Sequence, residues 1–254
     1  MEQTPFGPDA KEFEINPEPR CACVLLLDVS GSMGEIISNA GEDLGYTIQS
    51  DGQTYRAVSD GVAKIDELNA GLVAYKEALA ADSLAAKRVE VAIVTFGGVV
   101  QTICDFTTID GFHPPVLTPN GDTPMGQAIR EGVEMLRRRK DAYRANGIMY
   151  YRPWIFLITD GGATDEWKSA ADLVKQGEDS NGFLFFAVGV EGANFDRLKQ
   201  ISSKRPPLRL KGTRFRDMFQ WLAGTQRSAS RSKPGDTITP PDPTAPGSWG
   251  TIPV

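Results

Sequence analysis

Oxygen-bearing side chains follow two apolar segments of the chain and precede a helical one. The segment Ala22 to Asp28 runs into Asp28-Val29-Ser30-Gly31-Ser32, and the segment Trp154 to Thr159 runs into Asp160-Gly161-Gly162. A third polar stretch, 120–126, contains Thr123 and opens a long helical pattern. If the three stretches meet, two carboxylates and three hydroxyls converge, and such hard oxygen ligands select Mg²⁺, Mn²⁺ or Ca²⁺ over zinc or copper. The candidate metal ligands are therefore Asp28, Ser30, Ser32, Thr123 and Asp160.

The composition excludes several other kinds of site. The chain of 254 residues has one histidine, His113, so a zinc site built on histidines cannot form and a Ser-His-Asp triad could use only this residue. Its three cysteines form no Cys-x-x-Cys pair, which argues against a disulfide framework and predicts a reducing, cytoplasmic location. The longest apolar stretches, such as 183–190, are too short for a membrane span, and the first twenty residues lack the pattern of a secretory signal.

The positions of these side chains depend on the elements that carry them. Apolar runs alternate with segments of helical period, which predicts an α/β fold with an open, mostly parallel sheet and helices on both faces. The run 99–106 follows 89–96 across Gly97-Gly98, a connection too short for a crossover, so it should be an antiparallel edge strand. Ligands of such sheets bind at the carboxyl ends of the strands, where the candidate ligands lie. We expect strands at 22–28, 89–96, 99–106, 154–159, 183–190 and 208–211, and helices near 62–79, 124–140, 166–180, 194–202 and 215–224.

The polar motifs resemble those of a known family. Asp28-Val29-Ser30-Gly31-Ser32, Thr123 and Asp160 are similar to the D-x-S-x-S, T and D elements of the metal-ion-dependent adhesion site of von Willebrand factor A domains. The resemblance spans roughly residues 20–225. Within that superfamily, the runs 123–129 and 68–72 resemble bacterial TerY-type proteins of tellurium-resistance and stress-response systems.

The resemblance implies a three-layer, Rossmann-like fold and a site for one divalent cation, Mg²⁺ first and Mn²⁺ or Ca²⁺ next. Ser30, Ser32 and Thr123 would coordinate the cation directly or through water, and Asp28 and Asp160 would neutralise it largely through water. Few directly bound anions leave an open position for an Asp or Glu carboxylate of a partner protein. The implied function is a non-enzymatic interaction module, an adaptor or scaffold in a bacterial cytosolic stress-response or defence system, with kinase-like or phosphatase-like partners.

Three segments lie outside the part of the chain that resembles a minimal von Willebrand factor A domain. The resemblance implies a von Willebrand factor A domain at 21–226, preceded by an N-terminal extension at 1–20 and carrying an insertion at 34–61. Residues 227–254 are rich in Pro, Ser and Thr, which predicts a flexible tail. Trp249 is the one large aromatic residue of that tail, and it either anchors a partner from an exposed position or belongs to an ordinary disordered end.

The insertion contains a hairpin signal. Asp51-Gly52 predicts a two-residue turn that pairs Ile48 with Tyr55 and Tyr46 with Ala57. Because the insertion emerges directly from the loop of the two serines, we expect it near the metal face, where it either shapes partner choice or is a decorative surface loop. The candidate partner-binding residues are Tyr46, Ile48, Tyr55, Arg56 and Trp249.

Two other functions fit parts of the sequence. A metal-dependent phosphohydrolase could use Asp28 as its nucleophile, although Ser30 stands where haloacid-dehalogenase-type enzymes place an acid/base Asp. A nucleic-acid-associated protein could bind phosphates through the basic cluster 204–216. The same charges also suit an edge strand that must avoid pairing with other chains. We favour the interaction module over both alternatives.

Overall fold

A seven-stranded sheet forms the centre of the computed structural model, which describes residues 10–36, 43–50, 53–58, 62–202, 204–236 and 238–253. The strands are β1 (Cys21–Asp28), β4 (Val89–Gly97), β5 (Val99–Thr108), β6 (Trp154–Thr159), β7 (Leu184–Gly189), β8 (Leu208–Leu210) and β9 (Gly250–Thr251). Their order is β5-β4-β1-β6-β7-β8-β9. The inner pairs are parallel, whereas β5 and β9 run antiparallel to their neighbours at the two edges. The antiparallel β5 was predicted, and the antiparallel β9 was not.

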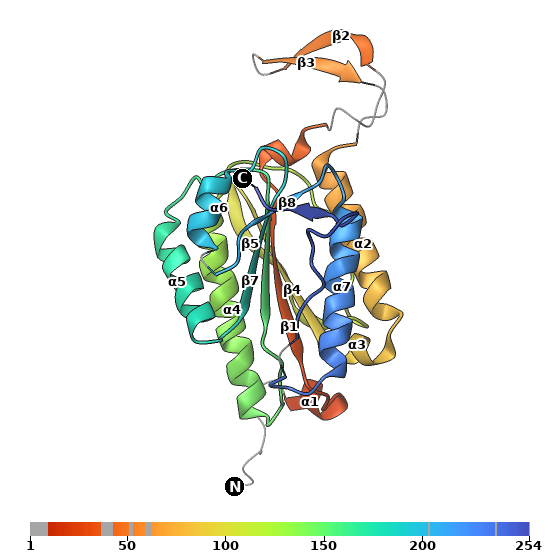
Figure 1. The fold of residues 1–254 in the computed structure, drawn as a ribbon, viewed down its shortest axis with the longest axis vertical. Coiled ribbons are helices and arrows are strands. Elements are labelled where there is room, and N and C mark those ends of the chain that lie inside the picture. Colours follow the sequence, from red (N-terminus) through yellow and green to blue (C-terminus); the bar gives the residue numbers. More distant parts are fainter. Residues whose placement is uncertain are drawn as a thin grey trace.

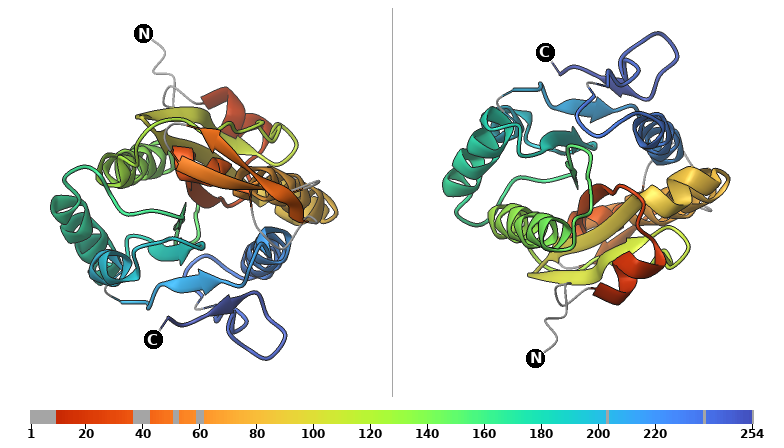
Figure 2. Two further views of the ribbon diagram at one scale, coloured as in Figure 1. Left: turned by 90° about the horizontal axis from the view of Figure 1, so that it is seen from above. Right: turned by 90° about the horizontal axis from the view of Figure 1, so that it is seen from below.

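Helices cover both faces of the sheet (Figures 1 and 2). One face is covered by α2 (Lys64–Ala80), α3 (Ser83–Arg88) and α7 (Phe215–Arg231), and the other by α4 (Met125–Ala145), α5 (Lys168–Asp179) and α6 (Phe195–Ile201), with the short α1 (Ala10–Ile15) beside α4. A hydrophobic core lies against each face. The predicted three-layer α/β fold is therefore confirmed. Within the described ranges, no helix combines the length and the apolar character needed to cross a bilayer.

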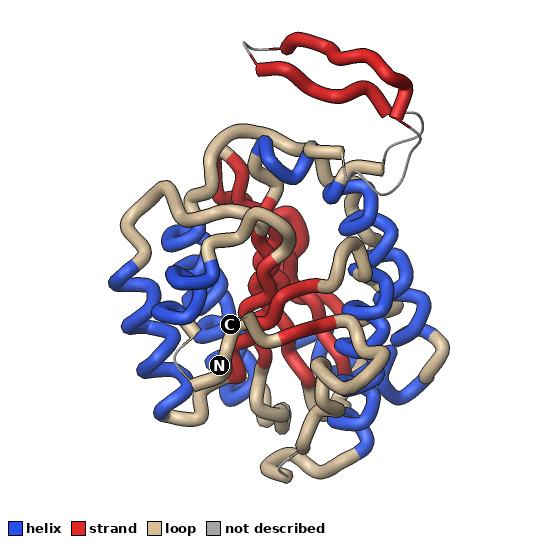
Figure 3. Tube along the Cα trace, turned by 45° about the horizontal axis from the view of Figure 1, so that its top comes forward, coloured by secondary structure: helices blue, strands red, loops and turns tan. Residues whose placement is uncertain are grey.

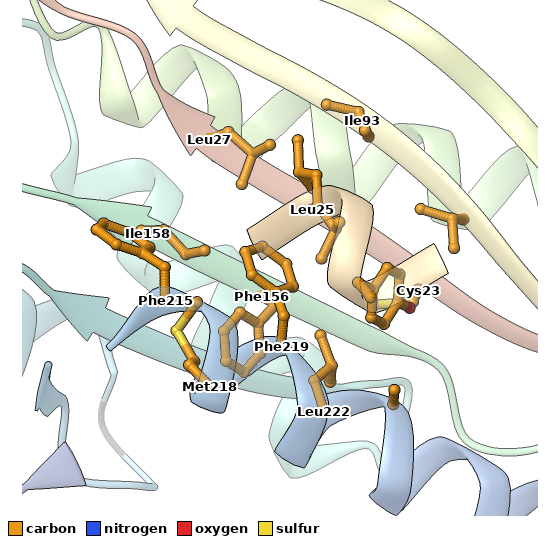
Figure 4. Close-up of a cluster of buried hydrophobic side chains, with 14 of the residues drawn as sticks. Cys23, Leu25, Leu27, Ile93, Phe156, Ile158, Phe215, Met218, Phe219 and Leu222 are labelled. Atoms are coloured by element: carbon orange, nitrogen blue, oxygen red, sulfur yellow. The ribbon is translucent and has the colours of Figure 1, made fainter. Parts of the chain in front are cut away.

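The central strand β1 shows why a continuous apolar run becomes a strand here. All eight of its residues are buried, because strands flank it on both sides and helices cover both faces. Cys23, Leu25 and Leu27 point into the core between the sheet and helices α2 and α7 (Figure 4), whereas Val24 and Leu26 belong to the core on the α4 side. Successive side chains of a strand face opposite sides. Burial of each large aliphatic side chain stabilises the fold by about 1.5–3 kcal/mol.

The described part of the N-terminal segment packs on the body of the domain. Phe13 of α1 is buried in the core on the α4 side, and its ring lies against the guanidinium groups of Arg20 and Arg139. Arg20 is itself fully buried and paired with Glu90 of β4. Residues 10–20 therefore contribute to a core that was expected to begin at residue 21.

The C-terminal segment corrects the prediction of a flexible tail. α7 was expected to end near Gly224 but continues to Arg231. Further along, Trp249 is 2% exposed and packs edge-on against Trp221, and the backbone N–H of Lys211 donates to the carbonyl of Trp249. Burial of the indole and the pairing of β9 with β8 anchor the segment to the sheet. Trp249 is therefore a core residue and not an exposed anchor.

The insertion forms the predicted hairpin from β2 (Asp43–Ser50) and β3 (Gln53–Val58). Ile48 lies opposite Tyr55, as predicted. The register shifts between Asp43 and Thr47, so the predicted partner of Ala57, Tyr46, lies within an irregular stretch. The predicted turn lies outside the described residues. Figures 1 and 3 show the hairpin beyond the end of the sheet at which α2 begins.

Candidate metal centre

The candidate ligands lie where neighbouring strands end. Asp28 is the last residue of β1, and Asp160 directly follows β6, the parallel neighbour of β1. Ser30 lies in the turn after β1, Ser32 lies in the short 3-10 helix η1 (Gly31–Gly34), and Thr123 precedes α4. The carboxyl ends of parallel strands meet at one edge of a sheet. All five residues therefore lie at the same edge.

Asp28 is the buried anchor of the centre. Its Oδ1 accepts the backbone N–H of Ser30 at 2.8 Å, and its Oδ2 accepts the hydroxyl of Thr159 at 2.5 Å. Burial raises the pKa of Asp28 to about 6 against the opposing effect of these hydrogen bonds, and the charge of Asp160 adds to the rise. A nearby cation favours the charged form of a carboxyl group. The environment of Asp28 therefore suits a positively charged neighbour.

Two serine hydroxyls join Asp160 in one cluster. The hydroxyl of Ser32 donates to Oδ1 of Asp160 at 2.7 Å, and Oγ of Ser32 lies 3.2 Å from Oγ of Ser30. Ser30 and Asp160 are both buried, whereas Ser32 is half-buried. Hydrogen-bond distances therefore connect Oγ of Ser30, Oγ of Ser32 and Oδ1 of Asp160 in series.

Thr123 approaches the cluster from a second loop. A Cβ atom on Gly161 would lie 3.4 Å from Oγ1 of Thr123 and 3.9 Å from Oδ2 of Asp28, so both oxygens face the same glycine. The backbone N–H of Thr164 donates to the carbonyl of Thr123 at 2.9 Å. α4 begins one residue later than expected, with Pro124 at the cap position. Thr123 therefore does not occupy the helix cap and lies at the cluster.

Asp165 fixes the loop that carries Thr123. Its carboxylate accepts the backbone N–H groups of Gly126 at 2.9 Å and Gln127 at 2.7 Å, so it caps α4 from a different loop. Replacing Asp165 with Ala removes both bonds, and we expect the free energy of unfolding to fall by about 1 kcal/mol. Urea unfolding measures this change. A loss no larger than that of the exposed Asp172→Ala on α5 would contradict the capping role.

Glycines hold the two ligand-bearing loops together. A Cβ atom on Gly97 would lie 2.5 Å from the carbonyl oxygen of Val29 and 2.6 Å from that of Asn120. Gly121 adopts a φ of 62°, which L side chains rarely adopt, and its carbonyl accepts the backbone N–H of Gly31 at 2.9 Å. The close approach of these backbones sets the distance between the serine loop and the threonine loop.

The positively charged side chain of Lys64 also lies at the candidate metal centre. Nζ of Lys64 donates to Oδ2 of Asp160 at 2.9 Å and to Oε2 of Glu35 at 2.8 Å. Burial acts to lower the pKa of Lys64, but the bonds to Glu35 and Asp160 outweigh burial and raise it, so the side chain is an ammonium ion. Lys64, Glu35 and Thr159 were not among the residues predicted from the sequence. Thr159 has a local signal because it precedes Asp160 at a strand end, whereas the contact between residues 64 and 160 leaves no local pattern.

The donor set fits a hard divalent cation. In the described part of the chain, no three His, Cys, Asp or Glu side chains form a metal-binding group. Coordination at this edge therefore needs further oxygens, which the hydroxyls of the cluster can supply, and Mg²⁺, Mn²⁺ and Ca²⁺ accept such oxygens. The residues that could hold the cation are Asp28, Ser30, Ser32, Thr123 and Asp160.

The predicted partner-binding residues fall into two places. Tyr46, Ile48, Tyr55 and Arg56 belong to the hairpin, which lies beyond the same end of the sheet as the metal centre (Figure 1). Trp249 belongs to the core beside α7. The hairpin stays a predicted partner surface, and Trp249 does not.

Comparisons with known proteins identify the fold. Among solved structures, the chain is similar to a von Willebrand factor type A protein from Catenulispora acidiphila at 14% identity and a TM-score of 0.55, with 82% of this chain and 43% of that chain covered. It is also similar to a mutant of the PilB minor pilin from Streptococcus sanguinis (13% identity, TM-score 0.53, 84% and 63% covered). A third similar structure is proximal thread matrix protein 1 from the mussel byssus (14% identity, TM-score 0.51, 82% and 48% covered). No curated protein matches the chain.

The family follows from a separate match. This chain spans less than half of the Catenulispora acidiphila chain, and at such identities the solved structures show the fold alone. The sequence model of the von Willebrand factor type A domain matches residues 23–218, which is most of the chain. Domains of this family are often metal-dependent adhesion or interaction modules. The chain belongs to the von Willebrand factor type A domain family.

Proposed function

We propose that the chain is a divalent-cation-dependent protein-interaction module, an adaptor or scaffold without catalysis of its own. Ser30, Ser32 and Thr123 would hold the cation directly or through water, and Asp28 and Asp160 would supply negative charge. When bound, the cation supplies positive charge to an Asp or Glu carboxylate of a partner protein. The observation that carries the proposal is the gathering of three hydroxyls with only two carboxylates at the carboxyl edge of the sheet.

The charge of the centre supports a partner carboxylate. Two carboxylates balance a divalent cation, and Lys64 already neutralises part of the charge on Asp160. A cation held by hydroxyls and partly neutralised carboxylates retains attraction for a further anion. Mg²⁺ is the first candidate because it is commonly held by one or two carboxylates with several waters, and Mn²⁺ and Ca²⁺ are alternatives.

The cellular setting of the proposal comes from the resemblance to TerY-type proteins. That resemblance supports a bacterial cytosolic stress-response or defence system in which the partners are kinase-like or phosphatase-like proteins. The free cysteines Cys21, Cys23 and Cys104 agree with a reducing, cytoplasmic compartment.

The geometry gives less support to a phosphohydrolase. A nucleophilic Asp28 would need an accessible carboxylate oxygen, but the side chain is fully buried and both of its oxygens accept hydrogen bonds, from Ser30 and Thr159. Ser30, the residue at the position of a general acid, has a hydroxyl that lies beside Ser32. An aliphatic hydroxyl is a poor proton donor near neutral pH.

Nucleic-acid binding also has less support. Lys204 pairs with Asp179, Arg205 with Glu178 and Arg214 with Asp217. These acids would compete with phosphate groups for the cluster 204–216. Ion pairs therefore occupy three of the six basic residues of this cluster, which leaves it with less charge for phosphate groups.

The first test is the effect of the cation on stability. At a Mg²⁺ concentration one hundred times the Kd, binding to the folded state adds about 2.7 kcal/mol. We expect the melting temperature to rise by roughly 5–11 °C relative to EDTA, as measured by differential scanning calorimetry. The variant Thr123→Ala should lose most of this rise, and Thr102→Ala, on the outer strand β5, should retain it.

The second test is the effect of the cation on partner capture. The immobilised full chain is exposed to a lysate of its own cells in Mg²⁺ and in EDTA, with Thr123→Ala and Thr102→Ala as paired baits. We expect a partner that the wild type and Thr102→Ala retain only in Mg²⁺. Capture that is equal in EDTA, or Asp28-dependent turnover of a phosphoester, would overturn the proposed function.

A further inference from the structure

Lys64 connects the metal centre to the insertion. It is the first residue of α2, and its side chain is 6% exposed. Its Nζ donates to Oδ2 of Asp160 at 2.9 Å and to Oε2 of Glu35 at 2.8 Å, and lies 3.4 Å from the backbone oxygen of Ser32. One buried ammonium group therefore contacts two residues of the candidate metal centre and one acidic residue outside it.

Glu35 and Lys64 also form the base of the insertion. The backbone N–H of Lys64 donates to the carbonyl of Glu35 at 3.2 Å. The adjacent residues on the side of the hairpin, Ile36 and Ala63, form an antiparallel bridge. The bridge between Ile36 and Ala63 therefore lies at the two ends of the segment that contains the hairpin. The hairpin is thus attached through the same residues that bring the ammonium group to Asp160.

The two oxygens of Asp160 have different partners. Oδ1 accepts the hydroxyl of Ser32, and Oδ2 accepts the ammonium group of Lys64. Asp28, Asp160 and Lys64 together carry a net charge of −1, where the two carboxylates alone would carry −2. The affinity of an oxygen site for a divalent cation depends on the charge of its ligands. Lys64 therefore removes half of the fixed negative charge on which the cation depends.

We infer that Lys64 competes with the divalent cation for Asp160, and that Glu35 relieves this competition by sharing the ammonium group. Because linkage is reciprocal, cation binding shifts Lys64 from Asp160 toward Glu35 at the base of the insertion. The occupancy of the metal centre and the attachment of the hairpin are thereby coupled. This inference rests on the cation site of the proposed function.

The test is a double-mutant cycle on cation affinity. Isothermal titration calorimetry gives the Kd of Mn²⁺ for the wild type, Lys64→Met, Glu35→Gln and the double variant. We expect Lys64→Met to bind about tenfold more tightly and Glu35→Gln to bind about two- to fivefold more weakly. If Glu35 acts through Lys64, the double variant binds as tightly as Lys64→Met. Lys76→Met, on the same helix, should match the wild type.

The metal-free protein gives a second readout. Without the cation, Lys64→Met should melt at a lower temperature than the wild type, because Asp160 loses its ammonium partner. The rise in melting temperature on addition of Mn²⁺ should then be larger than for the wild type. A rise no larger than that of the wild type would overturn the inference.

Each outcome of the cycle is decisive. An unchanged or weaker affinity of Lys64→Met, or additive effects in the double variant, would overturn the inference while the proposed function stands. If Lys64→Met does not fold, Glu35→Gln decides, since Glu35 has 61% of its side chain exposed, and an unchanged Kd overturns the inference. Cation binding by Lys64→Met under conditions in which the wild type binds none would support the inference. If no variant binds a cation, the proposed function fails and the inference falls with it.

Discussion

Replacing Asp28 with Asn should weaken divalent-cation binding by about 10- to 100-fold, the range for loss of a group that supports metal ligands. Asn keeps the size of the side chain and an oxygen that can accept the N–H of Ser30, while its amide can donate to the hydroxyl of Thr159. The substitution therefore removes the buried charge and retains most of the local structure. The Kd of Mg²⁺, measured by titration calorimetry, gives the effect directly.

The matched control for this substitution is Asp105→Asn on the exposed face of β5. It removes the same charge at a distance from the candidate ligands, so it should leave the Kd within about twofold of the wild type, because exposed charges are screened by salt. Equal effects of the two substitutions would show that Asp28 acts only through the net charge of the protein. An unchanged Kd in Asp28→Asn would remove Asp28 from the metal centre.

The parts of the fold that the sequence predicts are those with a regular pattern. β1 and β6 are continuous apolar runs because both of their faces are buried, and the burial itself imposes the pattern. The turn between β4 and β5 is predictable because a single residue, Gly98, connects them. β9 has two residues, and its pairing with β8 depends on contacts far away in the sequence. No local pattern of two residues could indicate it.

The C-terminal segment illustrates a limit of composition. A segment rich in Pro, Ser and Thr is expected to stay unpacked because it buries little apolar surface. Here the segment packs on the domain, because the ring of Trp249 fits against Trp221, its backbone carbonyl accepts the N–H of Lys211, and β9 pairs with β8. Composition averages over the segment and does not show whether one large side chain finds a place in the core.

The residues of the candidate metal centre also differ in how well the sequence predicts them. Asp28, Ser30 and Ser32 are close in sequence, and Asp160 directly follows a recognisable strand, so their convergence follows from the order of the strands. Lys64 reaches Asp160 across 96 positions from the first turn of a helix. Nothing in the period of that helix distinguishes a lysine directed at the metal edge from one directed at water.

A buried ion-pair network at the opposite end of β4 could not be predicted either. Glu90 is fully buried, and its carboxylate accepts from Nε of Arg20 at 2.6 Å and from Nε and Nη2 of Arg139 at 2.9 and 2.8 Å, with the hydroxyl of Tyr143 as a further donor. Arg139 also pairs with Glu12 of α1. The network ties the N-terminal segment, β4 and α4 to one another.

Replacing Glu90 with Gln should lower the free energy of unfolding by about 3–5 kcal/mol, because two buried guanidinium groups lose the charge that compensates them. For a domain of this size the melting temperature should fall by roughly 6–20 °C, as measured by calorimetry. Glu134→Gln is the matched control: Glu134 pairs with Arg137 on the exposed face of α4, and its loss should leave the melting temperature close to that of the wild type, because exposed ion pairs contribute little to stability. Similar effects of the two substitutions would mean that the buried network contributes no more than a surface ion pair. A large effect of Glu90→Gln alone would show that the buried charge of Glu90, which faces Arg20 and Arg139, stabilises the fold.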